Sequence, residues 1–477
     1  MQGFSLALFY SNMAHCCHSV HKIKRIKLKL SLCIEYMFFL PPRIFPLKRF
    51  ISLCAGMSFL CTGLSHAAIL NIDPTSVPAA AWTIFDPQSG QTIAEFNSHA
   101  QRAPASLTKM MVAYITLKEI KAGKLKRNEI ITANDVVHVV QPDESQMFLR
   151  PGQKISIDQL LSGLVVMSAN DAAVTLAQRI GGDLPHFVAR MNQEAKALGM
   201  TDTHFTNPAG ITMDGHYSSA ADMAKLGNAL IQQYPDYLYY SKQTSYTWNN
   251  RTHHATNILV KQDATVDGLK TGFTRAAGFN LALTAKRPTM NPDMPDRRLI
   301  VVVLGTTSPV MRAEVAHRLM NLAYNYTRDE VAIKAKQPIA EIPVLSGRIK
   351  RYTITPQNNK IMTTSLYQQP VAIDMRSFDQ ASGLLKLNGQ TVQPLAQTAT
   401  KLQVQLNKQQ LTAPFNQNVQ LATVKIYQNN QWVEDVAINN DVKLEPASLL
   451  QRFWAWIKQI LPFFKEAASP ATIFPLH

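Results

Sequence analysis

The sequence predicts an α+β domain with an antiparallel sheet, followed by a small all-β domain and a C-terminal amphipathic helix. Helical and strand-like segments alternate up to about residue 328, short β-branched runs without helical spacing follow, and a Trp-rich amphipathic stretch comes last. The 477 residues, 46% of them hydrophobic, are enough for two or three domains. The expected divisions are 1–67, 68–332, 333–445 and 446–477.

The first 67 residues have the layout of a leader segment. Two basic residues precede an apolar run at 51–64, and small residues around Ala67 offer a cleavage site. This order is typical of a secretory signal peptide, and the run is too short to span a bilayer comfortably. We therefore expect a signal peptide at 37–67, with Met37 as a possible true start, and export across the cytoplasmic membrane into the periplasm.

Charge and cysteine content exclude several function classes. All five cysteines lie before residue 62, so the product cut after Ala67 has no disulfide and no thiol nucleophile. Without residues 1–67 the chain has 40 basic and 31 acidic residues, a net charge of +9 that favours anionic surfaces. No zinc-finger, RNP or basic-helix pattern points to nucleic acid. His204, His253 and His254 have no acidic partner at metal-ligand spacing, so we expect neither a metal nor a cofactor.

The elements of the larger domain follow from periodicity and from the residues that end each segment. A turn at 86–90 between strand-like stretches predicts a hairpin, and loops rich in Gly, Pro, Asn and Asp separate the later strands. Gly123 and Gly182 stand where helices should end. Helices are expected at 106–122, from 156 or 158 to 165, at 172–181, from 219 onward and at 309–326, and strands at 80–84, 92–96, 269–274, 279–285 and 298–304.

The C-terminal stretch 449–461 has two contrasting helical faces. Apolar and aromatic residues occupy one face, and Gln451, Arg452, Lys458 and Gln459 the other. A Trp-rich face opposite cations is typical of a helix that lies in a bilayer interface. A helix docked on its own domain is the alternative. The apolar face consists of Leu449, Leu450, Phe453, Trp454, Ile457, Ile460 and Leu461.

Three short motifs occur in order along the larger domain. They are Ser106-Leu107-Thr108-Lys109, Ser168-Ala169-Asn170 and Lys270-Thr271-Gly272. The three-residue spacing places Ser106 and Lys109 on one helix face, where a neutral Lys109 amine can take the serine proton. Each motif alone has an ordinary structural explanation, namely a helix cap, an Asn-containing cap and a solvated edge lysine. Their order is what points to an acyl-transfer site.

The chain resembles the low-molecular-mass penicillin-binding proteins of the D-alanyl-D-alanine carboxypeptidase type over nearly its whole mature length. Runs around the three motifs are more specific than the motifs themselves. The resemblance implies a penicillin-binding, β-lactamase-like domain that binds β-lactams covalently and acts on peptidoglycan stem peptides. The matching runs are 104–111, 148–153, 168–173, 267–274 and 277–281.

The resemblance also implies a role for each motif residue. Ser106 would attack the D-Ala-D-Ala carbonyl, Lys109 would be the base, and Ser168 with Lys270 would form a proton shuttle. The backbone N–H groups of Ser106 and Phe273 would form the oxyanion hole. Phe273 replaces the His or Tyr often found there. Asn170, Lys270, Thr271, Gly272 and Arg312 would bind substrate, with Arg312 on its terminal carboxylate.

Other functions share these residues. A serine β-lactamase has the three motifs but commonly activates water with a Glu for fast deacylation, and we identify no such Glu. A DD-endopeptidase would apply the same residues to cross-linked peptides. A non-catalytic wall scaffold is a third class, although it would not need all the motif side chains. We expect a carboxypeptidase, peripheral on the outer face of the cytoplasmic membrane.

Overall fold

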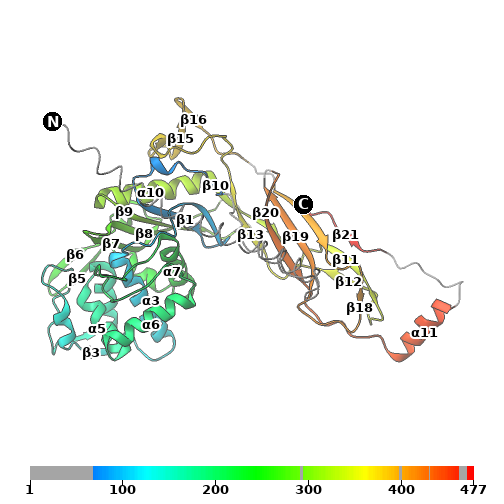
Figure 1. Ribbon diagram of the computed structural model, residues 1–477, viewed down its shortest axis with the longest axis horizontal. Coiled ribbons are helices and arrows are strands. Elements are labelled where there is room, and N and C mark those ends of the chain that lie inside the picture. The colour runs from blue at the N-terminus through cyan, green and yellow to red at the C-terminus, as the bar shows by residue number, and fades with distance from the viewer. Residues whose placement is uncertain (1–67, 290–293, 397–399, 429, 461–469, 477) are drawn as a thin grey trace, which may run out of the picture. The chain divides into compact units, whose positions relative to one another are not determined.

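The computed structural model describes residues 68–289, 294–396, 400–428, 430–460 and 470–476. The predicted signal peptide lies outside the described residues. The described chain combines helices with antiparallel sheets and continues into a β-rich second part (Figure 1). The predicted α+β class and the all-β domain that follows it are therefore confirmed. No helix among the described residues has the length and the apolar character needed to cross a bilayer.

A five-stranded antiparallel sheet with the order β2-β1-β9-β8-β7 forms the centre of the first part. Alternate side chains of β9 enter two different hydrophobic cores, because successive residues of a strand point to opposite faces. The sheet is thus covered on both faces. Its strands are β1 (Ala81–Asp86), β2 (Gln91–Phe96), β7 (Val266–Thr274), β8 (Gly278–Arg287) and β9 (Arg297–Thr306).

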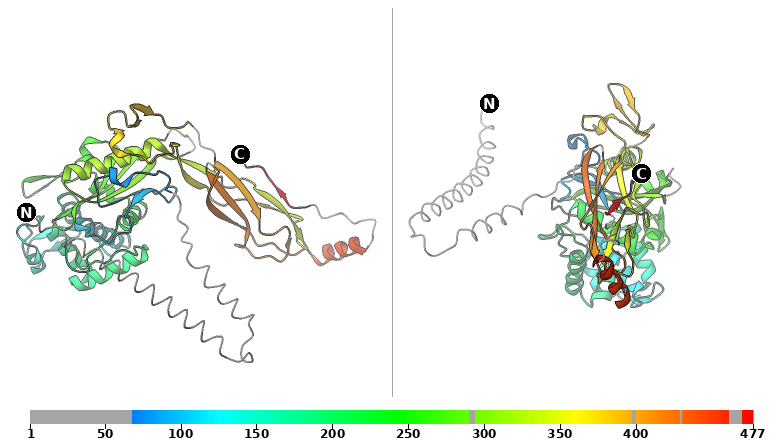
Figure 2. Two further views of the ribbon diagram at one scale, coloured as in Figure 1. Left: turned by 45° about the horizontal axis from the view of Figure 1, so that its top comes forward. Right: turned by 90° about the vertical axis from the view of Figure 1, so that its right-hand side faces the viewer.

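Helix α10 (Pro309–Tyr326) packs along one face of this sheet, and α7 (Ala220–Gln233) packs on the other (Figures 1 and 2). The Ser308 side chain caps α10 by accepting from the Met311 N–H, and Ser219 caps α7 in the same way. Both helices begin within a residue of their predicted starts.

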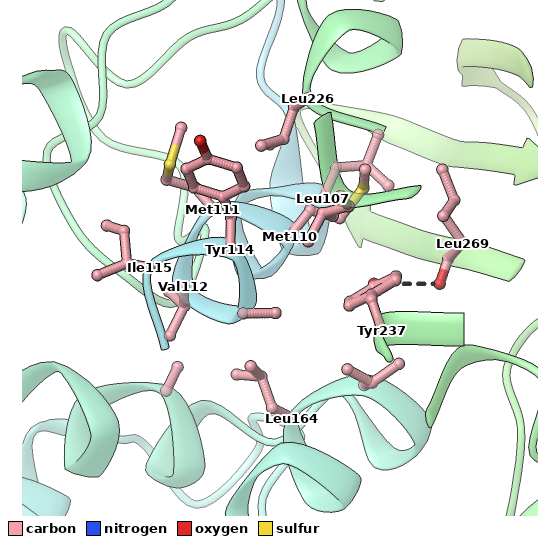
Figure 3. Close-up of a cluster of buried hydrophobic side chains, with 14 of the residues drawn as sticks. Leu107, Met110, Met111, Val112, Tyr114, Ile115, Leu164, Leu226, Tyr237 and Leu269 are labelled. Carbon is pink, nitrogen blue, oxygen red and sulfur yellow. Dashed lines mark hydrogen bonds between the residues drawn. The ribbon is translucent and has the colours of Figure 1, made fainter. Parts of the chain in front are cut away.

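The segment predicted as one helix at 106–122 consists of two elements. A 3₁₀ turn, η2 (Ala105–Thr108), leads into α3 (Lys109–Lys121), and Gly123 at φ +72° follows the helix. The first nine residues of α3 are buried, with apolar side chains all around the axis (Figure 3). Each fully buried apolar side chain contributes roughly 1.5–3 kcal/mol, so α3 is a rigid support for Ser106 and Lys109.

The next helices surround α3. Ser156 and Gln159 form a capping box at the start of α4 (Ile157–Ser162), which continues into a π-helical turn, η4 (Gly163–Met167). Helix α5 (Asn170–Gly181) ends at Gly182, φ +81°, as predicted. Helix α6 (Leu184–Ala197) was not predicted; Asp183 caps it, and Pro185 lies in its first turn, where proline is well tolerated.

Short elements complete the first part. They are η1 (Pro74–Ser76), β3 (Ile130–Thr132), η3 (Asp135–Val139), β4 (Lys154–Ser156), α8 (Tyr237–Ser241), β5 (Ser245–Trp248), β6 (Arg251–His254) and α9 (Leu259–Gln262).

The second part begins at β10 and has its own hydrophobic core, built from β10 to β13 and β17 to β20. Between these strands, Ile373, Met375 and Phe378 are buried in the same core as α10. The boundary near residue 332 therefore stays a prediction. The elements are β10 (Thr327–Ile333), β11 (Ala340–Leu345), β12 (Arg351–Ile354), β13 (Lys360–Ser365), η5 (Met375–Ser377), β14 (Phe378–Asp379), β15 (Leu384–Leu387), β16 (Gln390–Val392), β17 (Thr400–Leu406), β18 (Leu411–Thr412), β19 (Gln420–Gln428), β20 (Gln431–Asn439), α11 (Leu449–Ile460) and β21 (Thr472–Ile473).

Candidate active site

Ser106 and Lys109 lie in adjoining elements at the start of the buried helix. The Lys109 Nζ donates to Ser106 Oγ at 2.9 Å and to the carbonyl oxygen of Ala209 at 2.5 Å. Lys109 is 1% exposed, whereas Ser106 is only partly buried. A reactive hydroxyl that reaches solvent is therefore held against an amine that does not.

The surroundings of Lys109 favour its neutral form. Burial lowers the pKa of the Lys109 amine to about 7, and the negative charges of Glu144 and Asp171 partly oppose that shift. A substantial fraction of the amine is thus unprotonated at neutral pH. A lysine with the usual pKa near 10.5 would be almost entirely protonated, so burial here makes Lys109 able to accept a proton.

Ser168 and Lys270 form a second hydroxyl–amine pair. The Lys270 Nζ donates to Ser168 Oγ and to the Thr271 carbonyl oxygen, both at 2.9 Å. Ser168 ends η4 with φ +60°, a left-handed conformation that is uncommon outside glycine. Burial, with the charges of Lys109 and Arg312, lowers the pKa of Lys270 well below its usual value. The second and third motifs therefore meet in space, although 102 residues separate Ser168 from Lys270.

Asn170 contacts a segment that the motifs do not include. Its Nδ2 donates to the Glu144 carboxylate at 2.5 Å, and its backbone N–H donates to the Ser145 carbonyl. The neighbouring Asp171 carboxylate accepts from the backbone N–H groups of Met147 and Leu149, each at 2.9 Å. The start of α5 thereby holds residues 144–149 beside the site.

The 3₁₀ turn η2, which carries Ser106, is called the nucleophile turn below. Strand β7 approaches this turn so closely that only glycine fits at position 272. A Cβ there would lie 2.9 Å from the Pro104 carbonyl oxygen and 3.0 Å from the Ser106 nitrogen. Asn280 on β8 fixes the same turn, because its Nδ2 donates to the carbonyls of Ala103 and Pro104. The edge strand β7 therefore runs directly beside Ser106.

A hydroxyl pair and an arginine continue the site along β7. The Thr271 and Thr256 hydroxyl oxygens are 2.5 Å apart. Arg312 on α10 donates to the Thr256 carbonyl at 3.1 Å and to the Gly272 carbonyl at 3.4 Å, and burial lowers its pKa to about 10. Arg312 remains a cation at neutral pH and offers an anchor for an anionic group.

Strand β7 forms one wall of the site. Phe273 follows Gly272 near the end of this wall. Its ring is 49% exposed and stacks on Phe279, with the ring centroids 4.2 Å apart. The guanidinium of Arg312 lies 5.7 Å from the Phe279 ring centroid. Phe273 thus forms a rigid apolar edge to the site, where a histidine or tyrosine would offer a polar group.

The contacts described above join the residues that the three motifs predict for catalysis and binding. Their side chains form hydrogen bonds, and Gly272 lies against the turn that carries Ser106. Several residues that support them come from other segments and were not predicted: Glu144, Asp171, Thr256, Asn280, His216 and the Ala209 carbonyl. The run that contains Thr256 matches the family pattern only loosely. Asp171 and Asn280 lie in the runs 168–173 and 277–281 that resemble the family, and this is the signal that could have found them.

The arrangement is suited to acyl transfer. A partly exposed serine hydroxyl contacts a buried amine with a lowered pKa, and a second amine and a fixed cation lie along an edge strand that an extended peptide can join. These groups can supply a nucleophile, a base and a carboxylate anchor from side chains alone.

A family model described as D-alanyl-D-alanine carboxypeptidase matches residues 69–308, half of the chain. The D-alanyl-D-alanine carboxypeptidase DacD of Salmonella typhimurium is 39% identical over 254 residues, which cover 52% of this chain and 63% of that relative, less than two thirds. DacA of Escherichia coli K12 is 34% identical over 329 residues, covering 66% and 80%. Penicillin-binding protein 5 of Haemophilus influenzae superposes with a TM-score of 0.66 at 26% identity, covering 78% of this chain and 99% of that one.

Proposed function

The chain belongs to the D-alanyl-D-alanine carboxypeptidase family, and from that premise we propose that it removes the terminal D-alanine from peptidoglycan pentapeptide stems through a Ser106 acyl-enzyme. The observation that carries the proposal is the contact between Ser106 Oγ and the buried Lys109 amine. The names of the relatives supply the substrate class. β-Lactams would acylate the same serine.

In the proposed reaction, neutral Lys109 takes the Ser106 proton as the oxygen attacks the carbonyl of the D-Ala-D-Ala bond. The backbone N–H groups of Ser106 and Phe273 stabilise the developing oxyanion. Ser168 and Lys270 pass the proton from Lys109 on to the leaving amine, and terminal D-alanine departs. Water then attacks the ester and restores Ser106, so no cofactor takes part.

Substrate binding would use the wall of β7. The leaving D-alanine ends in a carboxylate, and the Thr271 hydroxyl and the Arg312 guanidinium are groups on this wall that can hold it. Asn170 would hold a substrate amide from the opposite side. In a cross-linked dimer the leaving group is a second stem peptide in place of D-alanine, so endopeptidase activity would need room for that larger group.

Release of D-alanine from a synthetic stem pentapeptide by the purified protein tests this proposal. We expect release from the pentapeptide at least about tenfold faster than cleavage of a cross-linked dimer, because the leaving D-alanine is much smaller than a second stem peptide. The D-alanine is measured with a coupled oxidase assay. Preferential cleavage of the dimer would instead favour an endopeptidase.

We also propose that the enzyme works in the periplasm, peripheral on the outer face of the cytoplasmic membrane. The supporting feature is α11, whose Leu449, Phe453 and Trp454 side chains are 84%, 53% and 57% exposed. A helix with exposed aromatic side chains and a nearby cation such as Arg452 is suited to the interface of an anionic membrane. After α11, β21 pairs with β11, so both ends of this segment attach to the β-rich part.

Substitutions within α11 test the membrane proposal better than truncation, because truncation would also remove β21. The double variant Phe453→Glu, Trp454→Glu should lose most binding to vesicles with anionic lipid, since it puts two negative charges on the apolar face. Vesicle co-sedimentation measures binding, and undiminished binding of this variant would contradict the proposal.

The polar face of α11 offers a control with the same change in net charge. Gln451 and Arg452 are both exposed, and the double variant Gln451→Glu, Arg452→Gln makes the protein more negative by the same two charges. The apolar face stays intact in this control. Its binding should therefore fall less than that of the Phe453/Trp454 variant, and equal losses would mean that charge alone governs the attachment.

A further inference from the structure

His216 lies behind the nucleophile turn and is not one of the motif residues. It is 3% exposed, and its Nε2 is 2.9 Å from the hydroxyl oxygen of Thr108. Thr108 itself is fully buried in η2, between Ser106 and Lys109. The imidazole therefore contacts the turn that carries both reacting groups, from the side away from solvent.

The hydrogen bonds of His216 determine which ring nitrogen carries the proton. The Nδ1 lies 3.0 Å from the backbone nitrogen of Thr206, whose N–H can only donate. Nδ1 is therefore an acceptor, and the hydrogen of the neutral ring sits on Nε2 and is donated to Thr108. Burial, then the charges of His204 and Lys109, lower the pKa of His216 to about 4, so the ring is neutral at neutral pH.

The loop that His216 contacts through Thr206 also supplies the second partner of the catalytic lysine. The Ala209 carbonyl accepts from Lys109 Nζ, and the Asn207 side-chain oxygen accepts from the N–H groups of Ala209 and Gly210 at 3.1 and 2.7 Å. A Cβ on Gly210 would lie 2.0 Å from the carbonyl oxygen of Ala105. Loop and nucleophile turn are thus in direct backbone contact.

We infer that His216 is a positioning residue that joins this loop to the nucleophile turn and so keeps the Lys109 amine buried between Ser106 and the Ala209 carbonyl. This inference rests on the proposed function. Without the imidazole, the loop loses its link to Thr108 and water reaches Lys109. The lysine then spends more of its time protonated, and acylation requires a higher pH.

The pH dependence involves a defined set of charged groups. His204 and Lys109 act on His216, Glu144 and Asp171 act on Lys109, and Lys109 and Arg312 act on Lys270. A His216 substitution changes none of the other side chains. A shift in the pH midpoint of acylation would therefore report the position and hydration of Lys109.

The test compares His216→Leu, His216→Gln and Thr108→Val in the full chain, with penicillin acylation rates measured from about pH 5 to 10. We expect His216→Leu and Thr108→Val to acylate about 10- to 100-fold more slowly at pH 7, with the midpoint about one unit higher. Glutamine keeps an Nε2 donor for Thr108 and should restore most of the rate. The exposed His99, changed to leucine, is the control.

The outcomes separate this inference from the proposed function. Wild-type protein that is not acylated would overturn the proposed function. If wild type is acylated, and the folded variants keep its midpoint or glutamine restores no more than leucine, the positioning role is overturned. If His216→Leu does not fold, Thr108→Val tests the positioning role. Valine has nearly the shape of threonine, so this variant removes only the hydroxyl that accepts from His216.

Discussion

Ser106→Ala is expected to abolish covalent labelling by penicillin and to lower the rate of D-alanine release by at least about 10⁴-fold. The hydroxyl is the group that forms the acyl bond, and its Oγ is the one held by Lys109. Lys109 keeps the Ala209 carbonyl as a partner, so the site should retain its shape. Labelling is measured with a fluorescent penicillin on denaturing gels.

A second serine gives a matched control for this variant. Ser156 caps α4, and its replacement by alanine should cost about 1 kcal/mol of folding free energy while leaving labelling intact. Retained labelling in Ser106→Ala would show that another residue is acylated.

Lys109→Met is expected to slow acylation by about 10³-fold. Methionine fills a buried site of similar length, so the fold should persist, but the amine that accepts the Ser106 proton is lost. The wild-type acylation rate should rise with pH through about 7, because deprotonation of Lys109 activates the serine. The variant should lose this dependence.

The pH profile makes the lysine assignment testable beyond the loss of rate. Acylation is followed in both proteins from about pH 5 to 10, with a melting curve at each end to show that the protein stays folded. A variant that keeps the wild-type midpoint would mean that a different group is the base, with Lys270 as the next candidate because its pKa is also lowered by burial.

The sequence predicted the motif residues and the order of most elements, because both leave local patterns. Ser156, Gly123 and Gly182 mark element ends through the nearest few residues, and the three motifs are contiguous. Helix α6 was not predicted, although its Asp183 cap is an equally local signal. Local chemistry thus accounts for the elements that were predicted correctly.

Residues that support the site from a distance could not be predicted in this way. Thr256 lies 15 residues from Thr271, and His216 lies 108 residues from Thr108. Only the fold of the loop and of β7 brings them to the motifs. The same holds for Met375. The sequence predicts that its segment belongs to the second domain, but its side chain is buried in the core beneath α10.

Mass spectrometry of the enzyme quenched during pentapeptide turnover is the most direct test of the central claim, that Ser106 is the acylated nucleophile. We expect a tetrapeptide acyl group on the peptide that contains Ser106, with the mass of the pentapeptide less D-alanine. An acyl group on another residue, or D-alanine release at the wild-type rate by Ser106→Ala, would contradict it.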